Sequence, residues 1–419
     1  MNVHPVIAAL RKHKTGTVLI ALQIALTLAI VCNAFFVVGE RLEKVHRVTG
    51  IDERDILFVS TSHAGLSTST DSDKARIDAD VQSDLQALRK LPDVADAYET
   101  ETLSLSNNNW GLGLKKTADA RGGVPGNIVF SDEHAIPTLG VKLIAGRNFN
   151  SDEVTPHTLL GVVEPPAVIL TKHMADELFR AGDALGKQVY MVGGATKPST
   201  IIGIVDKMES ASSQTNSDSI AWNCILLPFH MTESQRFYVV RAKPGRLEAA
   251  AKSVPAALYA QDPLRVIPDG PGENAGVRTF AQIREQAYKG DVALAQLMIA
   301  ISMILLAVTA AGIVGLTSFW VGQRHRQIGV RRALGATRHD ILQYFLVENA
   351  LISIGGVVLG AALAIGFNLW MVTEFEMHRL PVTYVLCGVV LLLLLGQTAV
   401  LGPAIRASSV APIEATRSA

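Results

Sequence analysis

The chain has 419 residues, and its 38 basic and 38 acidic residues leave no formal net charge at pH 7. This balance gives no reason to expect a nucleic acid as partner, and three cysteines are too few for a disulfide-stapled scaffold. Hydrophobic residues make up 49% of the chain and charged residues 18%. Their distribution along the chain is therefore the informative feature.

Four stretches without a charged residue predict transmembrane helices, at residues 15–39, 292–323, 349–373 and 380–405. Each is long enough to cross a bilayer core, which requires roughly 20 apolar helical residues. The first stretch follows a basic segment and could be a cleaved signal peptide. Its apolar part is about twice the length of a signal-peptide core and lacks a small-x-small cleavage site, which favours an uncleaved anchor.

The basic residues predict the orientation in the membrane. They gather before the first stretch, in the loop between the second and third stretches, and after the fourth. Lysine and arginine near membrane helices favour the cytoplasmic side. We therefore expect both termini in the cytoplasm and the large acidic segment 40–291 outside.

The outer segment reads as α/β. A strand at 55–60, a helix at 77–91 and a strand at 94–98 are followed much later by the same order, at 236–241, 247–259 and 264–267. We expect these two units to share one sheet, with a strand-rich subdomain inserted at about 110–230. The polar stretches 61–73 and 210–219 are predicted to be loops, and Cys224 is predicted to be buried and inert.

Amphipathic segments flank this domain at 37–48 and 280–297. They read as helical stalks that carry the outer domain, although ordinary solvated helix ends would show a similar pattern. Within the apolar stretches, Gly356, Gly360 and Ala364 form a small-residue stripe that lets helices approach closely, either between two chains or within one. Glu348 is expected to be an interfacial acid that is solvated or hydrogen-bonded.

No pattern of catalytic, cofactor-binding or metal-ligating residues stands out. The histidines are scattered, and the glycine-rich segment 182–188 lacks the spacing and the Ser or Thr of a phosphate-binding loop. It is better explained as a turn before a strand at 188–192. We therefore expect a non-catalytic chain without a cofactor.

The loop 323–341 is the most specific segment. It predicts a helix over 324–334 that ends at Gly335, followed by a Thr337–Asp340 capping box that opens the next helix. Arginines alone would suit anionic lipid. Here apolar residues accompany two arginines, which suits docking to a protein; the residues are Ile328, Val330, Arg331, Arg332, Ala333 and Leu334.

Segments 327–342 and 345–348 closely resemble the signature of MacB/FtsX-like ABC transporter permeases, and 402–415 is similar to that family's ending. Segments 140–149, 175–187 and 201–205 resemble its MacB-type periplasmic core. The resemblance and the apolar stretches together imply an α-helical membrane protein with four transmembrane helices and a large extracytoplasmic α/β domain between helices one and two. The expected divisions are a cytoplasmic N-terminal segment 1–15, helix 16–39, periplasmic core 40–291, helix 292–322, coupling loop 323–340, helix 341–372, periplasmic loop 373–380, helix 381–404 and cytoplasmic tail 405–419.

The resemblance also implies a function. It implies the permease subunit of a MacB-like system in a bacterial inner membrane, in which ATP hydrolysis moves the outer domains and drives efflux of periplasmic cargo. The implied partners are a separate ABC ATPase subunit, a second permease chain, membrane lipid, and a periplasmic adaptor with an outer-membrane channel. Gly335 and Thr337 join the six residues above as the expected ATPase-coupling set. Lipoprotein release of the LolC/LolE type and FtsX-like regulation of a wall hydrolase are the alternatives.

Overall fold

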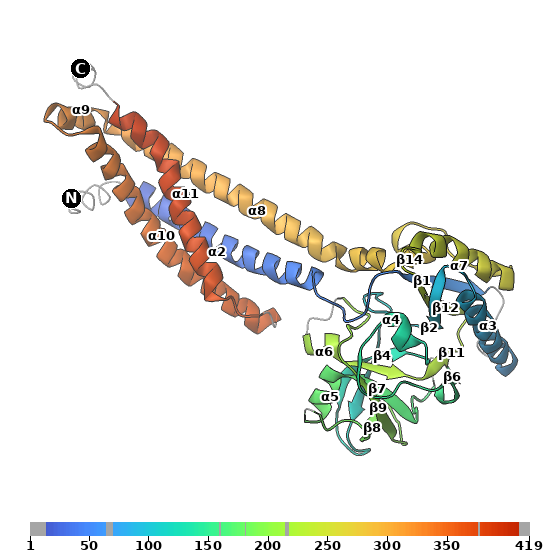
Figure 1. The fold of residues 1–419 in the computed structure, drawn as a ribbon. Helices are drawn as coiled ribbons and strands as arrows, with labels where there is room; N and C mark the ends of the chain where they lie inside the picture. The colour runs from blue at the N-terminus through green and yellow to red at the C-terminus, as the bar shows by residue number, and fades with distance from the viewer. Residues whose placement is uncertain are drawn as a thin grey trace. The chain divides into compact units, whose positions relative to one another are not determined.

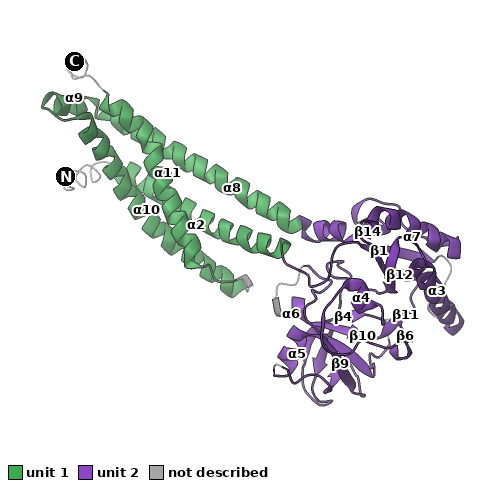
Figure 2. Cartoon of the chain, in the orientation of Figure 1, with its two compact units in different colours: residues 1–46, 290–419 green, residues 47–289 purple. Residues whose placement is uncertain are grey.

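The computed structural model describes residues 14–63, 70–158, 161–180, 182–213, 218–375 and 378–409. The chain divides into two compact units, one of residues 1–46 with 290–419 and one of residues 47–289 (Figures 1 and 2). The first unit is helical and the second is α/β, as the sequence predicted.

The helical unit is built from four long helices and one short one. The long helices are α2 (Lys14–Val45), α8 (Phe280–Gln323), α10 (Arg338–Phe375) and α11 (Val382–Ser408), and the short one is α9 (His325–Ala333). Each long helix contains an apolar window that is long enough to cross a membrane. Helices α2 and α8 extend beyond their apolar windows without interruption, over most of the segments predicted as stalks.

Small residues bring α10 against α2. A Cβ atom placed on Gly356 would lie 2.8 Å from the Ala21 carbonyl oxygen, and one on Gly360 would lie 2.8 Å from that of Ala25. One turn further along α10, the Ala364 carbonyl accepts a hydrogen bond of 3.2 Å from Asn33 Nδ2. Backbones this close require glycine. The small-residue stripe therefore serves packing within the chain, one of the two alternatives that the sequence left open.

Helix α8 contacts α2 through polar groups. Gln23 Nε2 donates to the Val308 carbonyl at 3.2 Å, and the hydroxyls of Thr27 and Thr309 lie 2.8 Å apart. Towards the other end, Arg41 Nη1 contacts Asp291 Oδ1 at 2.6 Å. Much of the apolar surface of α8 remains exposed within the unit, as at Met303 and Ile304. That surface is suited to lipid or to another membrane helix.

The α/β unit contains the sheet that the two repeated sequence patterns predicted. Its strand order is β13–β1–β12–β2, every adjacent pair is antiparallel, and β14 pairs with the edge of β1. Thus β1 and β2 run in the same direction on either side of β12, as in split βαβ units. The strands are β1 (Ile56–His63), β2 (Val94–Glu99), β12 (Gln235–Ala242), β13 (Arg265–Val266) and β14 (Val277–Thr279).

Helices α3 (Asp71–Arg89) and α7 (Leu247–Gln261) cover one face of this sheet, where Val81, Leu85 and Val254 join a core with Leu57 and Val240. Helix α3 begins six residues before the predicted start because Thr70 caps it: its hydroxyl accepts from the Asp73 N–H. The prediction of a loop over 61–73 is therefore wrong at both ends, since 61–63 belong to β1 and 71–73 to α3. Residues 64–69 lie outside the described part of the chain.

A second subdomain is inserted between β2 and β12, as predicted. Its mixed sheet has the order β5–β9–β7–β10–β4–β3–β8, and a separate pair joins β6 and β11. The elements are β3 (Trp110–Lys115), β4 (Val124–Phe130), α4 (Ala135–Leu139), β5 (Leu143–Gly146), β6 (Thr155–His157), β7 (Ala167–Thr171), α5 (Lys172–Leu178), β8 (Gln188–Met191), β9 (Ser199–Val205), α6 (Asp218–Trp222), β10 (Cys224–Leu227) and β11 (Phe229–Met231), with a short 3-10 turn at Ser151–Glu153. A second 3-10 turn, Gly272–Asn274, lies outside this subdomain, between β13 and β14.

Three local predictions in this subdomain have clear outcomes. Gly182 and Gly186 have positive φ angles and turn the chain before β8, as expected. Cys224 is fully buried as predicted, its thiol donates to the Met208 carbonyl at 3.3 Å, and burial raises its pKa, which disfavours the reactive thiolate. The predicted loop 210–219 is wrong at its end, because α6 begins at Asp218, and 214–217 lie outside the described residues.

Candidate coupling site

The short helix α9 lies between the two long helices α8 and α10 (Figure 1). Its end follows the sequence prediction closely. Leu334 is the C-cap, and Gly335 has a φ of +99°, a left-handed conformation that glycine adopts without steric cost. The Thr337 N–H then donates to Asp340 Oδ2 at 2.9 Å, and the Asp340 N–H donates to the Thr337 hydroxyl at 3.2 Å. The predicted capping box is therefore confirmed, and it fixes the start of α10.

A buried ion pair joins the two ends of this segment. Arg324 Nη1 contacts both carboxylate oxygens of Glu348, at 3.0 and 2.9 Å, and only 2% of Glu348 is exposed. The Tyr344 hydroxyl lies 3.4 Å from the same nitrogen. We call these three residues the coupling joint. Of the two alternatives predicted for Glu348, the structure shows the hydrogen-bonded one, and the acid is buried rather than solvated.

Two residues of the expected docking set serve the chain's own packing. Ile328 is only 5% exposed and packs in the core with Ile341 and Phe345 of α10, so the prediction that it presents surface to a partner is wrong. Arg332 Nη1 donates to the Ser408 carbonyl at the end of α11, at 3.0 Å. An apolar side chain on the inner face of α9 and an arginine at its end thus hold the helix to α10 and α11.

The remaining predicted residues are at the surface. Leu334 is 83% exposed and Val330 46% exposed, and Ala333 lies beside them. Arg331 is exposed too, with its guanidinium 5.3 Å from the centre of the Tyr344 ring. We call Val330, Ala333 and Leu334 the exposed apolar patch of α9. An exposed leucine this large, on a helix fixed at both ends, can act as an anchor for a partner protein.

Sequence reasoning missed the pairing of Arg324 with Glu348. Both residues were visible as charges that border apolar stretches, but 24 positions separate them. Only the return of the chain through α9 brings them together. A buried acid at a membrane helix end does require a cationic partner, and Arg324 is the arginine nearest to the preceding helix.

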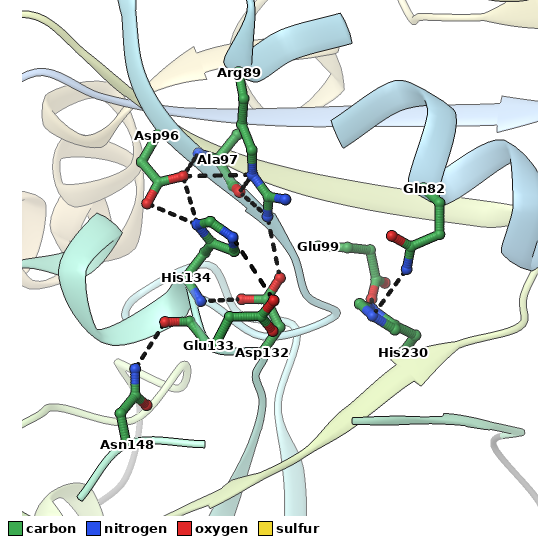
Figure 3. A network of polar contacts seen from close by, with 10 residues as sticks. All are labelled: Gln82, Arg89, Asp96, Ala97, Glu99, Asp132, Glu133, His134, Asn148 and His230. Carbon is green, nitrogen blue, oxygen red and sulfur yellow. Dashed lines mark hydrogen bonds and ion pairs between the residues drawn. The ribbon is translucent and has the colours of Figure 1, made fainter. Parts of the chain in front are cut away.

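A second polar cluster lies in the α/β unit, where the inserted subdomain meets the five-stranded sheet (Figure 3). Arg89 at the end of α3 donates to the Ala97 carbonyl of β2 at 2.7 Å and contacts Asp132 at 3.3 Å, just after β4. His134 lies 2.9 Å from Asp96. In the same region His230 of β11 lies 3.2 Å from Gln82 and 3.8 Å from Glu99. We call this cluster the lobe joint; it consists of Gln82, Arg89, Asp96, Glu99, Asp132, His134 and His230.

Burial dominates the protonation of the lobe joint. It raises the pKa of Asp132 to about 6 against the opposing charge of Arg89, and it raises the pKa of Glu99. Burial alone would lower the pKa of His230, but the neighbouring Glu99 and Asp132 carboxylates outweigh it and raise that pKa. The lobe joint therefore holds protons more tightly than the same groups would in water. Nothing in the sequence pattern indicated this cluster, because its members come from four separate elements.

No group of three or more histidine, cysteine and acidic residues that could hold a metal ion occurs in the described part of the chain. The lobe joint instead pairs its acids with arginine and histidine. Its geometry can link two subdomains and respond to pH.

Two protein families have models that match the chain. The MacB-like periplasmic core domain matches residues 17–257, and the FtsX-like permease C-terminal domain matches residues 299–412. Together the two matches include the lobe joint and the whole of the coupling joint.

Among curated proteins, the chain is 26% identical over 419 aligned residues to the macrolide export ATP-binding/permease protein MacB 1/2 of Paracoccus denitrificans, covering 97% of this chain and 57% of the relative. It is 28% identical over 253 residues to the protein MacB of Chromobacterium violaceum, covering 58% of this chain and 36% of the relative. The chain thus spans about a third to just over half of their length. A crystal structure of the periplasmic region of MacB from Actinobacillus actinomycetemcomitans aligns with 58% of this chain and 96% of its own, at 15% identity and a TM-score of 0.34.

Proposed function

The chain belongs to the MacB/FtsX-like ABC transporter permeases, and from this premise we propose that it is the membrane subunit of a MacB-like exporter powered by a separate ABC ATPase subunit. The conformational change of the ATPase is transmitted through α9 and the long helices to the outer domain, which drives efflux of periplasmic cargo. The observation that carries the proposal is the exposed apolar patch of α9 on a helix whose other face is fixed in the core.

A transmission element has to combine an exposed docking face with a stiff connection. Leu334 and Val330 supply the docking face. The Arg324–Glu348 pair and the Thr337–Asp340 capping box supply the stiffness on either side of α9. A displacement of the patch is then passed to α10, because the capping box fixes the start of that helix and the ion pair ties α10 to Arg324. Arg331, Arg332 and Gly335 complete the proposed coupling set, while Ile328 acts from within the core.

The cargo and the remaining partners follow from the relatives. Two relatives are named macrolide export proteins, and we propose export of a periplasmic substrate for this chain as well. The exposed apolar face of α8 fits a second permease chain in the bilayer, with lipid around it. A periplasmic adaptor and an outer-membrane channel are proposed as further partners. Both termini are proposed to lie in the cytoplasm, because basic residues accumulate beside the helix ends on that side.

The test is co-purification of the chain with its ABC ATPase. Leu334→Asp places a charge in the docking face at a cost of a few kcal/mol, which corresponds to roughly a hundredfold loss of affinity. The matched control is Leu264→Asp, the same change at a leucine of the outer domain that is 72% exposed. The ATPase should be lost from the first variant and retained by the second. Retention of the ATPase with full activity by Leu334→Asp would show that the patch of α9 is not the docking face.

A further inference from the structure

A cavity of about 280 Å³ lies in the α/β unit beside the first turns of α8. Its apolar lining is formed by Phe58, Leu105, Phe237 and Ile283, and its polar lining includes Arg278 and Asn107. The lining thus comes from the sheet strands β1, β12 and β14, from the segment after β2, and from the beginning of α8. The coupling joint and the lobe joint contribute no residue to it.

The aromatic part of the lining is preorganised. The rings of Phe58 and Phe237 stack with their centres 5.2 Å apart and their planes 6° apart. The Arg278 guanidinium lies 5.5 Å from the centre of the Phe58 ring. A flat apolar group can extend such a stack, and the cationic group next to it favours a negative charge at the same position.

The segment opposite the aromatic pair adopts a strained backbone. Leu105 has a φ of +65° and Asn107 a φ of +63°, although neither is a glycine. Leu105 is 1% exposed, so its side chain is directed into the molecule. The Leu105 N–H donates to the Ser210 carbonyl at 3.1 Å, and the Asn107 N–H donates to that of Ala211 at 2.9 Å. Backbone strain that the surroundings enforce at two positions of one short segment is typical of ligand sites.

We propose that this cavity binds a small amphiphile made of a flat apolar group and one carboxylate or comparable anionic head. Its volume is close to the lower limit of ligand pockets, about 300 Å³. Arg278 is the charged side chain of the lining, and the amide of Asn107 and the side chain of Gln286 add polar groups. A cationic ligand of the same shape would meet Arg278 and be excluded.

Glu101, an acid that neighbours the cavity, is not expected to repel an anionic ligand. Asn108, which lines the cavity, donates to the Glu101 carbonyl oxygen at 2.6 Å and lies 3.5 Å from its carboxyl group. Burial and the nearby Glu99 raise the pKa of Glu101 to about 8. At neutral pH the Glu101 side chain is therefore protonated and uncharged.

The cavity lies against the beginning of the long helix α8. Ile283, Gln286 and Ala287 belong to the first turns of α8, which continues without a break to Gln323 and contains an apolar window able to cross a membrane. A bound molecule would contact this helix. The site is thus proposed as an effector or cargo contact, independent of how the ATPase docks.

The test uses 2-naphthoate as an anionic probe and 2-naphthylmethylamine as its cationic counterpart. Binding to the full chain in lipid nanodiscs is measured by saturation-transfer NMR, with empty nanodiscs subtracted. Ala287→Trp should fill the cavity and abolish binding of 2-naphthoate. The matched control Ala281→Trp, at an exposed position of the same helix, should bind it like the unchanged chain.

A second variant keeps the proposal open to refutation if Ala287→Trp unfolds. Arg278→Gln removes the cation and keeps a polar side chain, and it should weaken the binding of 2-naphthoate about tenfold. Equal binding of the two probes, or unchanged binding of 2-naphthoate to both Ala287→Trp and Arg278→Gln, would overturn the assignment.

Discussion

The coupling joint and the lobe joint both connect two parts of the chain through buried charge, yet they are built from different groups. The coupling joint pairs an arginine with one carboxylate through two contacts near 3 Å. The lobe joint combines an arginine with two histidines and three acids, with contacts between 2.9 and 3.8 Å. Burial raises the pKa of Asp132 to about 6 and also raises that of Glu99, so the lobe joint gains or loses protons as the pH changes.

This difference suits the two positions. In the proposed function α9 transmits the motion of an ATPase, and the Arg324–Glu348 pair holds α10 to the residue before α9. In the proposed orientation the junction between the two outer subdomains lies in the periplasm, and its stability is expected to change with the pH there. Breaking each joint separately should therefore give different pH signatures.

The largest effect is expected at the coupling joint. Glu348→Leu leaves Arg324 buried without its acid, which should destabilise the helical unit by about 3–5 kcal/mol. The double variant Arg324→Met with Glu348→Leu should recover most of the lost stability, because it leaves no buried charge without a partner. Thermal unfolding of the purified full chain measures both. The comparison fails if the single variant is as stable as the unchanged chain.

The next-largest effect is a pH dependence of stability, which we expect at the lobe joint. The pKa of Asp132 is raised by burial and that of His230 by its acidic neighbours, so the folded lobe joint binds protons more tightly than the unfolded chain. Stability from these groups is present at low pH and is lost as pH rises through about 6 and above. One pKa unit corresponds to about 1.4 kcal/mol. Hydrogen exchange of β2 and β4 should therefore become faster, after correction for intrinsic rates, between pH 5 and pH 8.

A pair of variants tests whether Asp132 causes the pH dependence of hydrogen exchange. Asp132→Asn mimics the protonated acid and should reduce the change in exchange between pH 5 and pH 7. Asp152→Asn, at an exposed acid of the same unit, should leave it intact. Faster exchange at low pH than at high pH in the unchanged chain would reverse the predicted sign and refute this account of the lobe joint.

A smaller effect is expected where α10 packs on α2, next to the coupling joint. Gly360→Leu would place a side chain 2.8 Å from the Ala25 carbonyl oxygen and force the helices apart, at a cost of about 1–3 kcal/mol. Gly366→Leu on the same helix has open space around it and should be tolerated. The unfolding temperatures of the two variants provide the measurement, and equal values would argue against tight packing at Gly360.

The smallest effect concerns the capping box. Thr337→Ala removes the hydroxyl that accepts from the Asp340 N–H and should cost about 1 kcal/mol. The chain should remain folded, but coupling between ATP hydrolysis and export should weaken, because the start of α10 becomes less rigid. Export per ATP hydrolysed, measured in proteoliposomes with the ATPase, should fall while ATPase docking persists. Undiminished coupling would mean that this cap has only a local role.

The sequence by itself determined the four long apolar helices, the repeated strand–helix–strand units and the end of α9. These features follow from local rules: charge-free length in the membrane, the spacing of apolar residues, a glycine with positive φ, and a Thr-x-x-Asp cap. The apolar and basic residues of α9 also stood out in the sequence. The pattern did not show which of them face inward: Ile328 is buried and Arg332 bonds to the end of α11, and a short helix with apolar residues around it does not reveal which face meets the core.

The tertiary structure decided which distant residues meet. It turned Gly356 and Gly360 towards α2, paired Arg324 with Glu348, and assembled the lobe joint from four elements. It also created the cavity beside α8 from four separate parts of the chain. Contacts of this kind depend on how faces pack and how burial excludes water, and these are properties of the folded chain that local sequence patterns do not encode.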